Sequence, residues 1–173
     1  MYSGPISVSA SQTIRAIGIL SGSNNSAVGS AAYTINTGGG TPTNLLANAG
    51  FETASAASWT ENTVSGSMYI FDATAAGEFR SGVRARGYWM NTGSNCEQRL
   101  SQTVTIPTTG KYNATVWTRR ENYGSAFTFA RLLVMNGSTT LASANLPLGG
   151  SYASTQLTGI SLTSGASITF RIE

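Results

Sequence analysis

Alternation of apolar and polar residues with a period of two constrains the fold of this chain more than any other feature. It recurs in QRLSQTVTIP (98–107), GKYNATVWTR (110–119) and SITFRIE (167–173). The residues on the apolar faces are Leu100, Gln102, Val104 and Ile106; Tyr112, Ala114 and Val116; and Ile168, Phe170 and Ile172. Such alternation indicates antiparallel sheets with one buried face.

The turns between these segments also favour an all-β protein. Asn136-Gly137 stands between two apolar runs, which is the strongest local hairpin signal in the chain. No stretch of useful length has the helical period, so we expect few or no helices. Short strands at this spacing predict a β-sandwich of jelly-roll type.

The segment TGGGTPT (37–43) divides the chain by composition. Three glycines supply flexibility and Pro42 blocks a central strand, so we interpret it as a linker. Residues 1–36 are expected to form short strands at 6–8, 13–19 and 31–35. Three such strands bury too little apolar surface to fold alone.

Composition excludes several function classes. There is no His and a single Cys, Cys96, which rules out a Ser-His-Asp triad, a His metal site, a thiolate cluster and an intrachain disulfide. The net charge of +3 is carried almost entirely by scattered arginines. A nucleic-acid partner would need clustered basic residues, so we expect none.

No membrane association is expected, because no apolar run approaches the roughly 18 residues that span a bilayer. The start, MYSGPISVSA, lacks the basic and apolar regions of a secretory signal. The Ser/Thr/Asn-rich surface suits an extracellular bacterial protein, and we interpret the chain as an excised piece of a longer one.

Four motifs follow one another in residues 44–173: NLLANAGFE followed by Trp59, RSGVRARGYW (80–89), the strand pair SQTVTIPTTGKYNATVWTR (101–119), and TQLTGISLTSGASITFRI (155–172), which we interpret as a last hairpin. With these motifs the segment resembles the jelly-roll, galactose-binding-like carbohydrate-binding modules of bacterial polysaccharide hydrolases, and is most similar to those of endo-β-1,4-galactanases. This resemblance implies a sandwich that binds polysaccharide without catalysis.

A second pattern lies in residues 2–36 and consists of Tyr2, Pro5, Ile6, Thr13, Ile14, Ala16, Ser26, Val28, Tyr33 and Ile35. With these residues the segment resembles the second half of the Ig-like domain at the C-terminus of chitobiases and β-hexosaminidases. This resemblance implies a partial Ig-like spacer at 1–36, the linker at 37–43 and a module at 44–173. Modules of this kind usually close with a further strand beyond Glu173, so we expect residues 2–36 to cover part of the exposed edge.

Catalysis is not expected. Glycoside hydrolysis needs two carboxylates across a cleft. Five acidic residues lie in turn-like or polar segments and are interpreted as solvated loop acids, not as a pair on one strand face: Glu61, Asp72, Glu78, Glu97 and Glu121.

Sugar binding needs flat aromatic rings and planar hydrogen-bonding groups. Trp117 shares a polar strand face with Arg119 and is a candidate platform; the alternative is that a loop folds over it. Arg84, Arg86 and Tyr88 alternate against Trp89 and form a candidate binding face, with Trp89 as a second ring. The alternative is a solubilising face on which Arg84 and Arg86 pair with Glu78 or Glu97.

Five further residues receive specific predictions. Gln98, at the start of its strand, and Tyr123, in the loop RRENYGS, are candidate ligand contacts. Trp59 is expected to cap the core, and Gln102 to satisfy buried backbone groups. Cys96 is expected to be a bystander thiol.

The resemblance also implies a structural Ca²⁺ near the opening turn, held in part by Glu52. The expected partners are a polysaccharide or oligosaccharide and the domains of a parent enzyme in cis, with the module itself a monomer. The alternative function is a structural or adhesive extracellular sandwich that contacts a protein partner or spaces domains.

Overall fold

The computed structural model describes residues 4, 6–7, 11–33, 43–89, 95–120, 129–147 and 149–173. It comprises two compact units, Met1–Thr43 and Asn44–Glu173. Every helix or strand assigned to the described residues is a β-strand, which confirms the predicted all-β fold class. Among these residues no helix has the length and apolar character needed to cross a membrane.

The described part of the first unit contains one antiparallel hairpin, β1 (Gln12–Ala16) with β2 (Gly29–Tyr33). The strand expected at 13–19 ends at Ala16, and Ile6 and Ser7, the described part of the strand expected at 6–8, are not in a strand. The reason is that none of the described residues of this unit is buried, so no core supports a longer strand. All of β2 is exposed, and only Ile14 of β1 is partly buried.

The second unit is built on a five-stranded antiparallel sheet with the order β3-β6-β11-β8-β9. Its strands are β3 (Thr60–Ser65), β6 (Glu97–Thr105), β11 (Ser167–Ile172), β8 (Arg131–Asn136) and β9 (Thr139–Asn145). β8 and β9 join through Gly137, whose φ of 58° lies in the left-handed region that favours glycine. The hairpin predicted at Asn136-Gly137 is therefore present.

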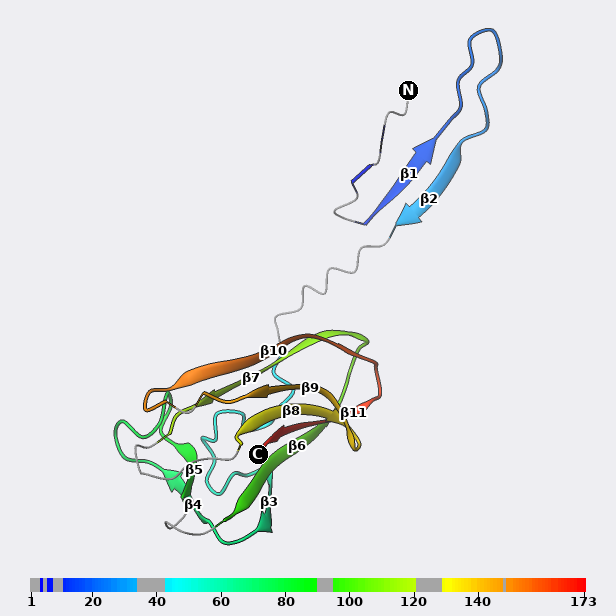
Figure 1. Ribbon diagram of the computed structural model, residues 1–173. Helices are drawn as coiled ribbons and strands as arrows, with labels where there is room; N and C mark the ends of the chain where they lie inside the picture. The colour runs from blue at the N-terminus through cyan, green and yellow to red at the C-terminus, as the bar shows by residue number, and fades with distance from the viewer. Residues whose placement is uncertain are drawn as a thin grey trace. The chain divides into compact units, whose positions relative to one another are not determined.

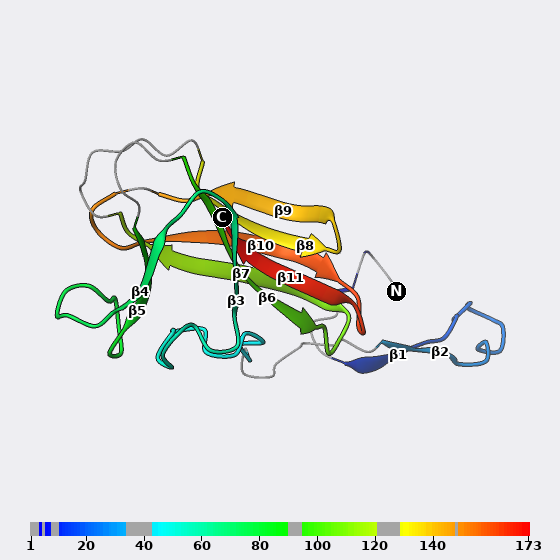
Figure 2. The ribbon, with the colours of Figure 1, turned by 90° about the horizontal axis from the view of Figure 1, so that it is seen from below.

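A second layer consists of β7 (Gly110–Thr118) paired with β10 (Ala153–Leu162). Figure 1 shows this pair lying over the five-stranded sheet, so the two form a sandwich. A third pair, β4 (Tyr69–Ala73) with β5 (Ala85–Trp89), lies at one end of these layers in both views (Figures 1 and 2).

The core lies between the two layers and draws on the faces that alternation predicted. Its buried members include Ile106 of the turn after β6, Leu132 of β8, Phe170 of β11 and Leu157 of β10. The segment 155–172, expected to be a hairpin, instead places β10 and β11 in different sheets. The segment 101–119, expected to be a strand pair, likewise places β6 and β7 in different sheets. Each apolar face meets the core from its own side of the sandwich.

The opening segment is held by a side chain and not by a neighbouring strand. Gln102, 9% exposed, accepts a hydrogen bond from the Ala47 N–H at 2.7 Å and donates to the carbonyls of Ala47 and Ser58 at 3.0 and 2.9 Å. Leu45 and Leu46 pack against the core beside it. Gln102 thus satisfies buried backbone groups as predicted. The prediction that residues 2–36 cover an open edge stays a prediction.

Trp59 caps the core, also as predicted. Its ring lies 5.1 Å from that of Phe51 and 5.8 Å, edge-on, from that of Phe170. Its indole N–H donates to the Asn48 carbonyl at 3.2 Å, so the polar atom of the ring has a partner.

Candidate functional site

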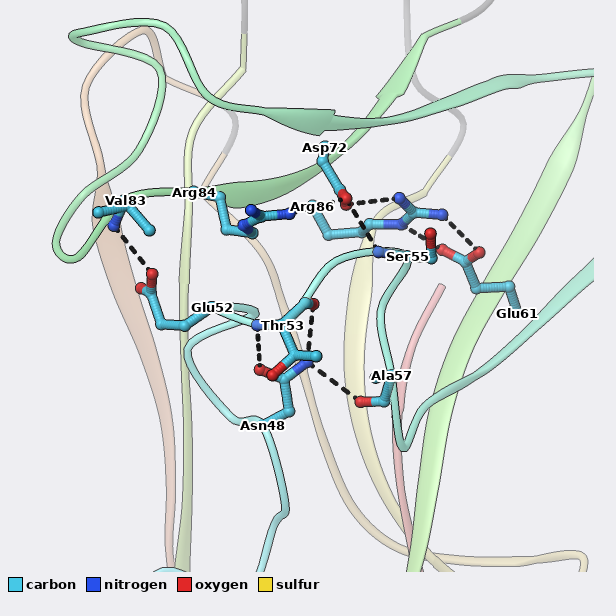
Figure 3. Close-up of polar contacts among 10 residues, drawn as sticks. All are labelled: Asn48, Glu52, Thr53, Ser55, Ala57, Glu61, Asp72, Val83, Arg84 and Arg86. Carbon is cyan, nitrogen blue, oxygen red and sulfur yellow. Dashed lines mark hydrogen bonds and ion pairs between the residues drawn. The ribbon is translucent and has the colours of Figure 1, made fainter.

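The opening turn 48–58 is a tightly folded loop that carries part of the candidate site. Asn48, Phe51, Ser55, Ala56 and Ser58 all have positive φ values, between 44° and 74°. The Asn48 side chain supports this backbone: its oxygen accepts from Thr53 N–H, and its amide nitrogen donates to the carbonyls of Thr53 and Ala57 (Figure 3). Side-chain bonds of this kind are how Asn stabilises irregular turns.

Glu52, the predicted calcium ligand, lies against the loop that precedes β5. Its Oε2 accepts from Val83 N–H at 2.8 Å, and the carboxylate occupies the space where a Cβ on Gly82 would stand. No group of three or more acidic, Cys or His residues that could hold a metal occurs in the described part of the chain. Calcium prefers six to eight oxygens. Among the described residues Glu52 therefore belongs to no cluster of acidic ligands, and no function is assigned to a metal here.

Beside this loop lies a network of two acids and two arginines, which come from β3, β4, β5 and the residue just before β5 (Figure 3). Arg86 of β5 forms a two-pronged pair with Glu61 of β3, with both N–O distances 2.7 Å, and reaches Asp72 of β4 at 2.7 Å. Arg84 reaches the other oxygen of Asp72 at 3.2 Å, and Ser55 N–H donates to that oxygen at 2.9 Å. The Arg86 side chain is only 10% exposed, so this is an interior network.

The network fixes the charges of its members. The hydrogen bond from Arg86 holds the pKa of Glu61 below its usual range, and the Ser55 backbone bond does the same for Asp72. Burial, reinforced by a 2.7 Å hydrogen bond to Glu61, raises the pKa of Tyr88. Arg84 thus pairs with Asp72, and Arg86 pairs with Glu61 and Asp72, in place of the expected Glu78 or Glu97. Glu61 and Asp72 lie in strands β3 and β4 and not in solvated loops. Long-range pairing of this kind leaves no local sequence signal.

These lowered pKa values bear on catalysis. Glycoside hydrolysis needs one carboxyl group whose raised pKa lets it donate a proton. Glu61 and Asp72 share Arg86 and are both shifted the other way. Their geometry is that of a structural ion network.

The outward face of the β4–β5 hairpin carries the aromatic residues. Tyr69 and Trp89 are direct cross-strand partners, 66% and 47% exposed, and the Phe71 ring stacks on that of Tyr69 with centroids 5.7 Å apart. Phe71 lies across Gly87, where a Cβ would collide with its ring. Tyr69, Phe71 and Trp89 form what we term the aromatic face. Arg86 and Tyr88 point to the opposite, inward side.

The sequence analysis did not identify Tyr69 and Phe71 as candidate binding residues. The signal was present in YIFDA, where they alternate with Ile70 and Asp72. Their strand partner lies sixteen or more residues downstream, across the β4–β5 connection. Pairing with Trp89 was therefore not visible locally.

Trp117 is 44% exposed on the outer face of β7. The Arg80 guanidinium, from the β4–β5 connection, lies 4.3 Å from its ring centroid. Nearby, Arg119 lies 5.5 Å from the Tyr152 ring, and the Tyr152 hydroxyl donates to the Glu78 carbonyl at 2.8 Å. A loop thus does reach over Trp117 while leaving it partly exposed. Such guanidinium stacking is a favourable cation–π contact.

The remaining candidate residues lie elsewhere. Gln98 points inward from β6, where its oxygen accepts from the Thr63 hydroxyl at 2.7 Å and its buried Nε2 has no partner among the described residues. Cys96 is a partly buried thiol whose pKa is raised by burial, consistent with low reactivity. Tyr123 and Glu121 lie outside the described residues.

Several solved structures share this fold. TmCBM61, in complex with β-1,4-galactotriose, matches with a TM-score of 0.58 and 23% identity over 76% of this chain and 88% of its own. The enzymatically active domain of tailspike protein 4 from bacteriophage CBA120 matches at 0.52 and 16% identity, over 75% of this chain and 19% of its own. The Stig cyclase FisC from Fischerella sp. TAU matches at 0.50 and 20%, over 72% and 84%.

No protein-family model matches the chain, and no curated protein matches it significantly. The similarity to solved structures establishes the fold, which is the jelly-roll sandwich found in a carbohydrate-binding module. The same fold also occurs in a tailspike active domain and a cyclase. The choice between binding and catalysis therefore rests on this chain's own residues.

Proposed function

We propose that residues 44–173 are a non-catalytic carbohydrate-binding module. In this proposal the module holds a multidomain bacterial glycoside hydrolase on plant cell-wall β-glycans, with β-galactan, β-glucan and xyloglucan as the candidate ligands. It acts outside the cell, as a monomer, with the parent catalytic domain attached in cis. Tethering of this kind raises the local concentration of enzyme at its substrate.

The observation that carries the proposal is the aromatic face. Exposed aromatic rings that form a contiguous patch usually mark an interaction site. Cross-strand partners on one face of a sheet lie about 5 Å apart, so Tyr69 and Trp89 present adjacent rings. The apolar C–H faces of pyranose sugars stack on rings of this kind. The likeness to a galactotriose-binding module supports the same reading.

Affinity electrophoresis on galactan, xyloglucan, mixed-linkage glucan, xylan and cellulose tests this function. We expect retardation on at least one polymer, and at least about tenfold weaker binding by Tyr69→Ala and Trp89→Ala, because truncating a central aromatic anchor costs about 2 kcal/mol. Tyr33→Ala, at a 49% exposed Tyr in the first unit, is the matched control.

The outcomes separate the alternatives. Retardation that is lost in Trp117→Ala but kept in the two aromatic-face variants would move the site to Trp117 and keep the function. No retardation on any polymer would contradict the proposal and favour an adhesive or spacer role.

A further inference from the structure

The hairpin turn at Asn136-Gly137 has no part in the proposed function. β8 ends at Asn136 and β9 begins at Thr139, so Gly137 and Ser138 are the two residues of the turn. All residues from Asn136 to Thr139 are exposed. Figures 1 and 2 show β8 and β9 joining at the end of the sandwich that lies away from the β4–β5 hairpin.

The covalent structure of this turn places a nucleophile beside the Asn136 side chain. Attack of the Gly137 backbone nitrogen on the Asn136 side-chain carbonyl carbon closes a five-membered ring, so the two atoms are always within reach of each other. After other asparagines the side chain of the next residue crowds this approach, but no asparagine except Asn136 is followed directly by glycine. A Cβ at Gly137 would meet no atom within 4 Å, so the ring closes into open space.

The attacking nitrogen also lies outside the strand ladder. Asn136 and Thr139 are the last paired residues of the hairpin, and Gly137 follows Asn136 with a φ of 58°. The hydrogen bond of a β-turn runs from the N–H of its fourth residue, here Thr139, to the carbonyl of its first, here Asn136. The Gly137 N–H takes no part in that bond and belongs to an exposed residue, so hydroxide from the solvent can remove its proton.

We propose that Asn136 is a site of spontaneous deamidation. The deprotonated Gly137 nitrogen bonds to the Asn136 side-chain carbonyl carbon, and the bond from this carbon to the amide nitrogen breaks. The amide nitrogen takes up a proton from water and leaves as ammonia, so a cyclic imide remains. Water then adds to either carbonyl of the imide and opens the ring to aspartate or isoaspartate. Both products carry one more negative charge than the parent, and the reaction consumes only water.

The isoaspartate product changes the backbone, because the main chain then runs through the former side-chain carbon and gains a methylene group. Asn136 is paired on both sides, with Thr139 of β9 and with Ile168 of β11. Ile168 is 4% exposed and belongs to the core. The extra methylene displaces both pairings, so isoaspartate lowers the stability of the sandwich, whereas aspartate leaves the backbone unchanged.

The test is incubation of the folded full chain in warm, mildly alkaline buffer, followed by isoelectric focusing, peptide mapping by mass spectrometry and an isoaspartyl methyltransferase assay. We expect an acidic shift and a gain of about one mass unit at Asn136, with conversion at least about tenfold faster than at the reference asparagines. These references are exposed and precede Thr, Ala and Leu: Asn62, Asn113 and Asn145.

Two variants separate the steps of the reaction. Asn136→Gln keeps an amide but would need a larger ring, so it should abolish the acidic shift. Asn136→Asp carries the new charge without the extra methylene, so its Tm should stay near that of the fresh parent while the isoaspartate form melts lower. Conversion at Asn136 no faster than at the reference asparagines would overturn the inference. Conversion that occurs only after unfolding in urea would also overturn it, because the folded turn would then protect the site.

Discussion

Replacing Arg86 with Met tests whether the buried ion network holds the β4–β5 hairpin on the sandwich. The guanidinium makes three contacts of 2.7 Å with Glu61 and Asp72 and is 10% exposed. Met keeps much of the apolar stem but leaves two acids without their main cation. Removing one partner of a buried pair costs about 3–5 kcal/mol.

The lower end of that range applies here. Glu61 and Asp72 are each about one-fifth exposed, and each keeps another donor, Tyr88 and Arg84 respectively. We therefore expect Arg86→Met to lower the free energy of unfolding of residues 44–173 by about 3 kcal/mol. For a domain of this size that corresponds to a fall in Tm of about 10 °C.

Urea unfolding followed by tryptophan fluorescence, together with calorimetry, measures this change. Arg15→Met, at an exposed position of the first unit, should stay within about 0.5 kcal/mol of the parent. The double variant Arg86→Met with Glu61→Leu should recover part of the loss, because replacing a whole buried pair with apolar groups is often neutral. An Arg86→Met protein as stable as the parent would refute the reasoning, and strict additivity in the double variant would show that the two residues act independently.

Three further predictions follow from named contacts. Because the pKa values of Glu61 and Asp72 are lowered in the folded state, the stability they contribute is complete at neutral pH and is lost as the pH falls below about 4. When Tm is measured as a function of pH, the loss of stability in acid should be shallower in Arg86→Met than in the parent. Parallel curves for the two proteins would contradict the assignment. Thermal melting should be equal in EDTA and in excess Ca²⁺, because Glu52 is a single carboxylate already bonded to Val83, and a rise with Ca²⁺ would show that a calcium site forms. Gly87→Ala should displace the Phe71 ring and weaken glycan binding with little change in stability, which affinity electrophoresis and near-UV circular dichroism will check.

Features set by a strand's own alternation were predictable. The buried side of β6 follows from its period of two, and Gln102 on that side must then find polar partners in the core. Gly137 in the β8–β9 turn follows from local turn chemistry. Strand pairing was not predictable in the same way. Consecutive strands such as β10 and β11 belong to different sheets, because the connection between them passes from one layer of the sandwich to the other.

The candidate site shows where alternation stops being informative. Periodicity divides the segment 84–89 into Arg84, Arg86 and Tyr88 on one side and Gly87 and Trp89 on the other, but it does not say which side meets solvent. Charge alone favours exposing the arginines. The fold reverses this choice because Glu61 and Asp72, from two other strands, supply carboxylates that compensate Arg86 inside. Once the charges are paired in the interior, the rings are left facing outward, and the same ion network that stabilises the hairpin presents its aromatic face.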